Sequence, residues 1–297
     1  MWEVARLCRM STLTNQGIEL EVGYKLSVDK VNLSFLANAS YVKNEIKNLG
    51  NQTGYIDKES LPTLGTVSRN QNGYPIGYFF GYKAIGVFQT QEEIDNYISP
   101  ATGKPIQPNA VPGDTKFEDL NGDGVISDDN EDRTMIGKPN PDWMVGLTVA
   151  ADWNGFDLSA FFQGSFGADV FDALRRYELA AVNYTSDALE RRTGPGTSNS
   201  MPRIVLGDTP KNFRPSTLLV HDASFLRLRN LQVGYTLPAQ LTRKAYIQRL
   251  RFYASFDNLL TITGYKGMDP EIGSTMGIDK GVYPQARVYT FGLNLTF

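Results

Sequence analysis

The sequence lacks several features that mark common classes of protein. Its only cysteine, Cys8, cannot form an internal disulfide. No apolar run of about 18 residues is present, which excludes a helix that spans a membrane. The first ten residues, MWEVARLCRM, have no apolar stretch long enough for a secretory signal. With 29 basic residues against 32 acidic ones and no basic block, nucleic acid is not an expected partner.

Aromatic residues and glycine, by contrast, are abundant. The 297 residues include 15 Tyr, 16 Phe and 28 Gly, yet the mean hydropathy is only -0.30. Many aromatic side chains in a chain that is not apolar overall indicate a surface with apolar stripes. The wall of a β-barrel has such a surface.

Long segments of alternating character are the clearest local pattern. In residues 17–28 and 31–43, large apolar side chains alternate with small or polar ones. The same alternation returns in residues 143–153, 156–166, 224–237, 248–259 and 288–297. A period of two is typical of strands with two unlike faces, so the sequence predicts seven antiparallel strands. The dipeptide Asn154–Gly155 predicts a two-residue hairpin turn.

The predicted strands are long for a soluble protein. They run to ten or more residues, whereas strands in soluble proteins mostly have about five or six. A tilted strand that crosses a bilayer needs about 9 to 11 residues, which favours a transmembrane barrel over a soluble sandwich. Aromatic residues near the strand ends fit interfacial girdles: Tyr24, Tyr41, Trp143, Trp153 and Tyr289.

The connections alternate between short and long. Residues 29–30, 154–155 and 238–247 form the short ones, and residues 44–141, 167–223 and 260–286 the long ones. Outer-membrane barrels have short periplasmic turns and long outer loops, so we expect the long segments on the cell surface. Single-chain barrels have an even number of strands, so a count of seven predicts a C-terminal fragment of a larger transporter, preceded by further strands.

Six blocks of sequence, in order, carry a resemblance to a known family. They are NQGIELEVGYK, GYPIGYFFGYKAIGVFQTQEEID, PGDTKFEDLNGDGVISDDNEDRTMIGKPNPDW, HDASFLRLRNLQVGYTLP, FYASFDNLLTITGYKGMDPEI and YPQARVYTFGLNLTF. Residues 15–297 resemble the C-terminal barrel part of SusC/RagA-type TonB-dependent outer-membrane transporters. Residues 1–14 do not match and are interpreted as a spurious N-terminal segment.

The resemblance implies a transporter without enzymatic activity in the bacterial outer membrane, in contact with its lipid. Such proteins have a plugged barrel of roughly 22 strands, and this sequence lacks the plug and most of the barrel. The implied partners are a SusD-like surface lipoprotein and the TonB complex, which would act through the missing plug region. The implied substrate is an oligosaccharide or a peptide. The final strand resembles the signal read by the barrel-assembly machinery: Tyr289, Phe291, Leu293, Leu295 and Phe297.

Residues 119–132 contain most of a calcium-loop motif. Oxygen ligands stand at alternate positions, and Gly124 supplies the bend at position 6. The candidate ligands are Asp119, Asn121, Asp123, Val125 through its carbonyl, Asp128 and Asp132. Position 12 is Asn130 rather than glutamate, so a loop rich in Asx turns, without metal, is the alternative interpretation.

Other segments have two interpretations each. The aromatic side chains of Tyr74, Tyr78, Phe79, Phe80 and Tyr82 could stack on sugar rings or pack a loop against the barrel. Their segment, residues 73–89, is placed in the outer loop, with a small hairpin as an option. Residues 167–193 have helical spacing, including the pair Asp172 and Arg176, and could face the lipoprotein or solvent. The polar strand faces should line the lumen: Glu19, Glu21, Asp157, Gln163, Arg249 and Arg251.

Two competing functions follow from the same residues. A secreted, calcium-dependent glycan-binding module with a soluble all-β fold would also use the alternating strands and residues 119–132. A barrel hydrolase would need His221 beside Asp222 and Ser224, but adjacent residues of an extended strand point to opposite faces. We therefore expect His221 to have a structural role.

Overall fold

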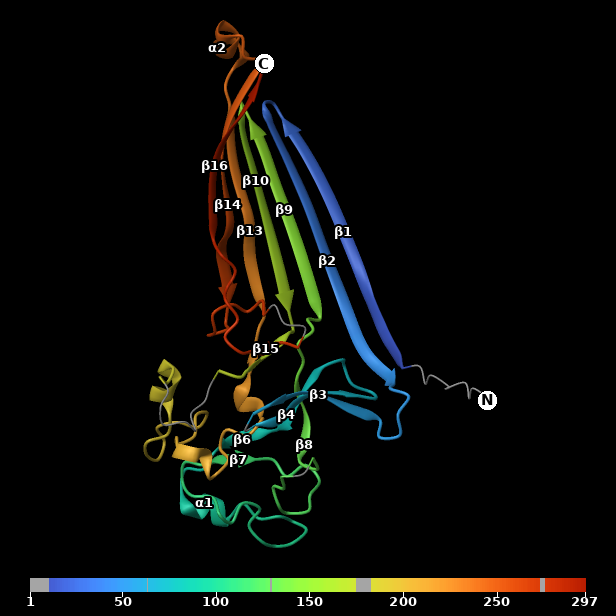
Figure 1. Cartoon of the computed structure of the whole chain (residues 1–297), viewed down its shortest axis with the longest axis vertical. Helices are drawn as coiled ribbons and strands as arrows, with labels where there is room; N and C mark the ends of the chain where they lie inside the picture. Colours follow the sequence, from blue (N-terminus) through green and yellow to red (C-terminus); the bar gives the residue numbers. More distant parts are fainter. Residues whose placement is uncertain (1–10, 63, 129, 175–182, 273–275) are drawn as a thin grey trace, which may run out of the picture.

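The protein consists of a tall sheet and a smaller domain at one end of that sheet (Figure 1). The computed structural model describes residues 11–62, 64–128, 130–174, 183–272 and 276–297. The sequence analysis set residues 1–14 apart; of these, residues 1–10 lie outside the described residues, whereas residues 12–14 belong to the first strand of the tall sheet, which corrects that boundary. Residues 175–182 also lie outside the described residues. No helix in the described part of the chain is long and apolar enough to cross a membrane.

The tall sheet, which we call the wall, has seven antiparallel strands that pair in chain order. Its strands are β1 (Thr12–Val28), β2 (Val31–Asn48), β9 (Trp143–Trp153), β10 (Phe156–Phe166), β13 (Phe225–Thr236), β14 (Arg249–Thr263) and β16 (Val288–Thr296). The seven predicted strands and their antiparallel arrangement are confirmed. The first hairpin is longer than predicted, because β1 begins at Thr12 and β2 continues to Asn48.

One face of the wall is apolar and open to the surroundings. Ile18 is 74% exposed and Phe291 is 75% exposed, although both side chains lie in the middle of long strands. A water-soluble monomer rarely exposes an apolar surface that extends over a whole sheet. The alternation in the sequence thus produces a sheet whose apolar side chains form a surface rather than a core.

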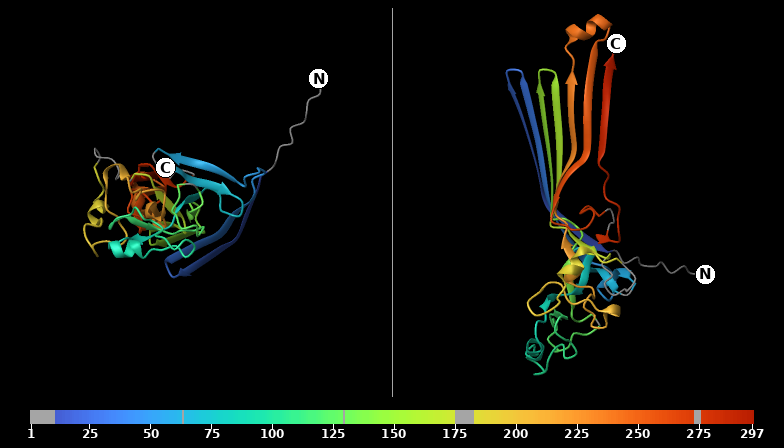
Figure 2. Two further views of the ribbon diagram at one scale, coloured as in Figure 1. Left: turned by 90° about the horizontal axis from the view of Figure 1, so that it is seen from below. Right: turned by 90° about the vertical axis from the view of Figure 1, so that its left-hand side faces the viewer.

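Three short connections lie together at one end of the wall (Figure 2, right). Two of them are two-residue turns, in which Asp29 and Asn154 adopt φ values of 53° and 48°. Positive φ is the requirement of the turn type that best matches strand twist, and Asn and Asp tolerate it. The third connection contains α2 (Ala239–Thr242) and η4 (Arg243–Ala245).

The long connections build a domain at the other end of the wall, which we call the outer domain. Its four-stranded sheet contains β3 (Tyr55–Leu61), β4 (Gly65–Gln71), β5 (Tyr78–Tyr82) and β8 (Arg133–Gly137). Its smaller sheets pair β12 (Val220–Asp222), β11 (Asp169–Asp172) and β15 (Ile278–Asp279), and β6 (Ala84–Val87) with β7 (Thr115–Phe117). Its helices are α1 (Gln91–Asp95), η1 (Ser186–Glu190), η2 (Leu206–Asp208) and η3 (Thr217–Leu219).

All three long connections contribute to one core of the outer domain. Val67 and Phe79 come from the first connection, Phe171 and Leu219 from the second, and Ile278 from the third. Each of these side chains is at most 3% exposed. The parallel pair β11–β15 also joins the second connection to the third. The loops therefore form a single packed body rather than three independent segments.

In two segments of the outer loops, the described residues differ from what the sequence indicated. Residues 73–89 contain β5 and β6, but these strands do not form a hairpin, because β5 pairs with β4 and β8 while β6 pairs with β7. The helix predicted for residues 167–193 is replaced at its start by β11, and only η1 is helical in its described part. Arg176, the predicted partner of Asp172, lies outside the described residues. In both places a long-range strand partner outweighs the local pattern.

Candidate functional site

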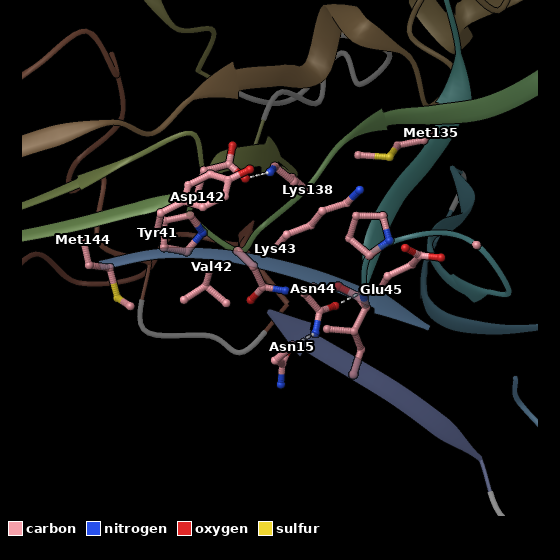
Figure 3. Close-up of a pocket in the computed structure, with 15 residues that line it drawn as sticks. Asn15, Tyr41, Val42, Lys43, Asn44, Glu45, Met135, Lys138, Asp142 and Met144 are labelled. Atoms are coloured by element: carbon pink, nitrogen blue, oxygen red, sulfur yellow. Dashed lines mark hydrogen bonds and ion pairs between the residues drawn. The ribbon is translucent and has the colours of Figure 1, made fainter. Parts of the chain in front are cut away.

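A cavity of about 740 Å³ lies where the wall meets the outer domain (Figure 3). Strands β1, β2 and β9 supply part of its lining, and the rest comes from loops that enter and leave the outer domain. The lining residues of the strands are Asn15, Tyr41, Val42, Lys43, Asn44, Glu45 and Met144. Those of the loops and β8 are Gly73, Pro75, Ile76, Met135, Lys138, Asn140, Pro141 and Asp142.

Side-chain amides hold this cavity together. The Asn44 Nδ2 donates to Asn15 Oδ1 at 2.6 Å, which joins β1 to β2. The backbone N–H of Ile76 donates to Asn44 Oδ1 at 2.7 Å, and Asn140 Nδ2 donates to the Ile76 carbonyl at 3.2 Å. Three asparagines distant in sequence thus hold the loop at Ile76 against the strand ends.

The lining of the cavity combines charged, amide and apolar side chains. Lys138 forms an ion pair with Asp142, four residues later in the chain. Lys43 and Glu45 add one charge of each sign to the lining. Met135 and Met144 supply adaptable apolar surface. Pockets with few polar groups on an apolar lining orient small ligands. This arrangement can hold a ligand through hydrogen bonds and shape.

The polar face of the wall contains paired charges. Arg251 binds Asp157 through two hydrogen bonds, at 2.8 and 2.5 Å. The Gln163 side chain accepts from Arg229 Nε at 2.7 Å. The sequence placed Asp157, Gln163 and Arg251 on the polar face. There Gln163 pairs with the neighbouring strand β13, and Arg251 of β14 reaches across β13 to Asp157 of β10.

A cluster at the outer end of β13 was missed by sequence reasoning. Arg227, 2% exposed, donates to Asp269 at 2.5 Å and to Glu271 at 3.0 Å. Arg229 binds the same Glu271 carboxylate at 2.6 Å. Both acids lie in the third long connection, so the arginines bind that loop to the wall. The acidic residues in the segment DPEI were visible in the sequence, but their partners were not.

A bulge explains why the arginines escaped the strand pattern. Phe161 pairs with Asn230 and Phe162 with Leu228, so Arg229 is an extra residue in β13. Arg227 and Asn230 therefore share a face although they are three residues apart. The simple alternation of period two ends at this point, and with it the signal that assigns residues to faces.

Residues 119–132 form a loop stabilised by its own backbone. The Asp119 carboxylate accepts from the N–H groups of Gly122 and Gly124, at 2.7 and 2.9 Å. Asp132 accepts from Leu120 and Ser127 at 3.1 and 3.0 Å. Within the described ranges, no three His, Cys, Asp or Glu side chains are gathered as a metal site. These contacts fit the Asx-turn interpretation, and calcium stays a prediction.

The other candidate ligands of that loop also have hydrogen-bond or ion-pair partners. Asn121 Nδ2 donates to Asp123 Oδ2 at 3.0 Å, and Val125 N donates to Asp123 Oδ1 at 2.9 Å. Asp128 is drawn to Lys211, outside the loop. Asn121 thus contacts Asp123, and its Nδ2 also donates to Glu131 Oε2 at 2.9 Å.

The five predicted aromatic residues lie mainly inside the outer domain. Tyr78, Phe79, Phe80 and Tyr82 are between 0 and 4% exposed, and only Tyr74 is half-buried. The Tyr74 and Tyr78 rings stack at 4.9 Å. Burial raises the pKa of Tyr78 and of Tyr82, so both hydroxyls remain neutral donors. Their burial supports the loop-packing interpretation, because a ring that stacks on sugar needs an open face.

His221 and the last strand complete the predicted set. His221 lies on β12, 3.9 Å from Asp172 on the neighbouring strand β11. Tyr289, Phe291, Leu293 and Leu295 lie on β16, which pairs with β14. Phe297 follows this strand and is 76% exposed.

Comparisons with known proteins identify relatives of the chain. No protein-family model matches it. It is 34% identical over 238 residues to TonB-dependent receptor P3 of Formosa agariphila, an alignment that covers 76% of this chain and 23% of that receptor. It is 30% identical over 295 residues to TonB-dependent receptor SusC of Bacteroides thetaiotaomicron, covering 97% and 27%. The chain thus spans about a quarter of the length of these curated relatives.

Solved structures show the same fold. The chain superposes on the RagAB peptide transporter with a TM-score of 0.72 and 25% identity, over 97% of this chain and 30% of that one. For the RagAB peptide importer in its open-open state, the TM-score is 0.73, with 24% identity and coverage of 97% and 29%.

Proposed function

The chain belongs to the SusC/RagA-type TonB-dependent receptors, and on this premise we propose that it is part of an outer-membrane importer of oligosaccharides or peptides. The wall would form a section of the transmembrane barrel. The outer domain would lie on the cell surface. A SusD-like lipoprotein would close the barrel from outside, and TonB would supply energy through a plug carried by the rest of the receptor.

Two features of the wall support this proposal most: its exposed apolar face and the difference between its two ends. Its apolar face is exposed over strands of 9 to 18 residues. Short turns lie at one end and the whole outer domain at the other. Both features are those of an outer-membrane barrel section, and neither would benefit a soluble glycan-binding module.

The substrate class rests on the cavity in Figure 3. Its amide groups and paired charges are suited to the hydroxyls of a glycan or the backbone of a peptide. The RagAB structures describe a peptide importer, which favours peptides for this chain as well. The amides Asn15, Asn44 and Asn140 are the residues we assign to ligand contact.

Membrane topology gives the first test. We would insert a short epitope between Gly103 and Lys104, on the outer domain, or between Lys244 and Ala245, in the turn at the opposite end. Both sites are exposed. In intact cells that express the complete receptor, antibody should label the first tag only, and permeabilised cells should show both.

Three results would contradict the proposal. They are surface labelling at residue 244, equal labelling of both tags in intact cells, and release of the protein into detergent-free buffer. The last result would favour the secreted, soluble module.

A further inference from the structure

A second cavity, of about 600 Å³, lies within the outer domain. It shares no lining residue with the cavity in Figure 3. Tyr82 of β5 and Arg133 of β8 form one side, and the segment 207–215 forms the other. Three of its lining residues are cationic, namely Arg133, Lys211 and Arg214, against the two acids Asp128 and Asp208.

Aromatic rings fix the two guanidinium groups of this cavity. The Arg133 guanidinium lies 4.3 Å from the centre of the Phe80 ring. The Arg214 guanidinium lies 4.7 Å from the Tyr82 ring and 4.9 Å from the Phe117 ring. Stacking of this kind holds a planar guanidinium in one orientation, which reduces the entropy lost when it binds a planar anion.

Arg133 has no carboxylate partner among the residues that the structure describes. Its Nη2 donates to the carbonyl of Phe80 at 2.8 Å, and its Nη1 to Asn130 Oδ1 at 3.3 Å. The Nε atom is buried and has no hydrogen-bond partner. A half-buried cation with only neutral partners favours the approach of an anion.

Arg214 is also only partly compensated. Its Nε donates to the Lys211 carbonyl at 3.2 Å. Its Nη1 is buried, lacks a hydrogen bond, and lies 4.0 Å from Asp128 Oδ1. The other acid, Asp208, accepts from the N–H groups of Asn212 and Phe213 at 2.8 and 2.9 Å, so its carboxylate supports the loop.

Asp128 is the carboxylate that meets the cations. It pairs with Lys211 and approaches Arg214, yet its side chain is 68% exposed. Exposed ion pairs contribute little to stability, so the exchange of this carboxylate for another costs little. Asp128 therefore shows which chemical group Lys211 and Arg214 accept.

We propose that this cavity binds a carboxylate of the imported oligomer, which replaces Asp128 on Lys211 and Arg214 and also binds Arg133. Leu64, Phe213 and Pro215 supply apolar surface for the adjoining part of the ligand. Acidic peptides and uronic-acid glycans share this carboxylate chemistry. The proposal rests on the import function and adds to it a preference for acidic substrates.

Binding to the complete receptor, purified in detergent, tests the site. We would measure Kd by calorimetry for tetraglutamate and for tetragalacturonate, with tetraglutamine and galactotetraose as neutral controls. One acidic ligand should bind about tenfold more tightly than its neutral control, and Arg214→Gln should remove most of that difference. Asp128→Asn should tighten acidic binding several-fold, because a competing carboxylate is removed.

Controls separate binding from folding. Arg243→Gln changes an arginine in the turn at the other end of the wall and should leave both affinities unchanged. Arg214→Lys keeps the charge and should retain part of the preference, even where Arg214→Gln fails to fold.

Defined outcomes would overturn the inference. They are equal affinities for acidic and neutral ligands, absence of binding by both acidic ligands, and an Asp128→Asn variant that binds acidic ligands no better than the parent. Preference for tetraglutamate or for tetragalacturonate identifies the source of the carboxylate. The result of labelling the tag inserted after Gly103 does not depend on ligand binding at this cavity. Failure of the acidic-ligand test therefore leaves the import proposal intact.

Discussion

At the scale of single residues, Asp269 controls how the third long connection is held. Burial opposes the ionisation of this carboxyl. The N–H groups of Gln285 and Glu271, together with Arg227, outweigh burial and lower the pKa of Asp269. The ionised form is therefore the one that binds the loop to the wall.

Acid should release this loop. A carboxyl whose pKa is lower in the folded state than its ordinary value near 3.9 contributes stability above that value. That contribution is lost as the pH falls through the lowered pKa. Hydrogen exchange at Glu271 and Gln285, corrected for the intrinsic effect of pH, should rise at acid pH. Asp269→Asn should show the fast exchange already at pH 7, and slow exchange in that variant would contradict the assignment.

Phe79 is a fully buried member of the core of the outer domain. Its ring is 0% exposed and lies 5.8 Å from the Phe171 ring, which belongs to another connection. Phe79→Ala should lower the free energy of unfolding of the outer domain by about 3–5 kcal/mol. The check is thermal unfolding followed by limited proteolysis. Ile85→Ala, at a side chain that is 49% exposed, is the matched control and should change little.

At the scale of elements, strand register determines which residues lie on the exposed apolar face of the wall. Inserting one alanine between Leu231 and Gln232 would move the side chains of the residues before the insertion to the opposite face of β13. Arg227 would then lie on the apolar face, where a charge is costly. The insertion should abolish assembly, measured as loss of heat-modifiable migration of the receptor in outer-membrane fractions. The same insertion between Lys244 and Ala245 should be tolerated, and normal assembly of the Leu231 variant would refute the register argument.

The strands of the wall could be predicted from sequence because their information is local. Alternation from Ile18 to Val28 or from Phe156 to Phe162 needs no knowledge of distant residues. The elements of the outer domain could not be predicted in this way. Strand β5 has only five residues and is entirely buried, so its side chains show no alternation. Its pairing with β8 depends on residues more than fifty positions away.

The cavities escaped prediction for a related reason. Asn15, Asn44 and Asn140 are unremarkable polar residues in the sequence, and they form a group only after β1, β2 and the loop at residue 140 come together. The arginines of the second cavity lie on β8 and near η2, eighty positions apart along the chain. Aromatic residues could be recognised, but which of them would be exposed depended on packing that the sequence does not show.

At the scale of the whole molecule, the chain combines two bodies with opposite relations to their surroundings. The wall exposes apolar side chains on one face, whereas the outer domain buries them. The three long connections join β2 to β9, β10 to β13 and β14 to β16, and all three enter the outer domain (Figure 1). Each connection therefore begins and ends at a strand of the wall. The two cavities lie at the junction of the two bodies and inside the outer domain.

The shared core of the outer domain also sets a temporal order. Val67 and Ile278 belong to the same cluster, although more than two hundred residues separate them. Contacts of such high sequence separation form late in folding, because a long loop must close first. The outer domain cannot complete this core until all three connections have reached the same side of the wall. A fully packed outer domain therefore indicates that all three connections of the wall are in place.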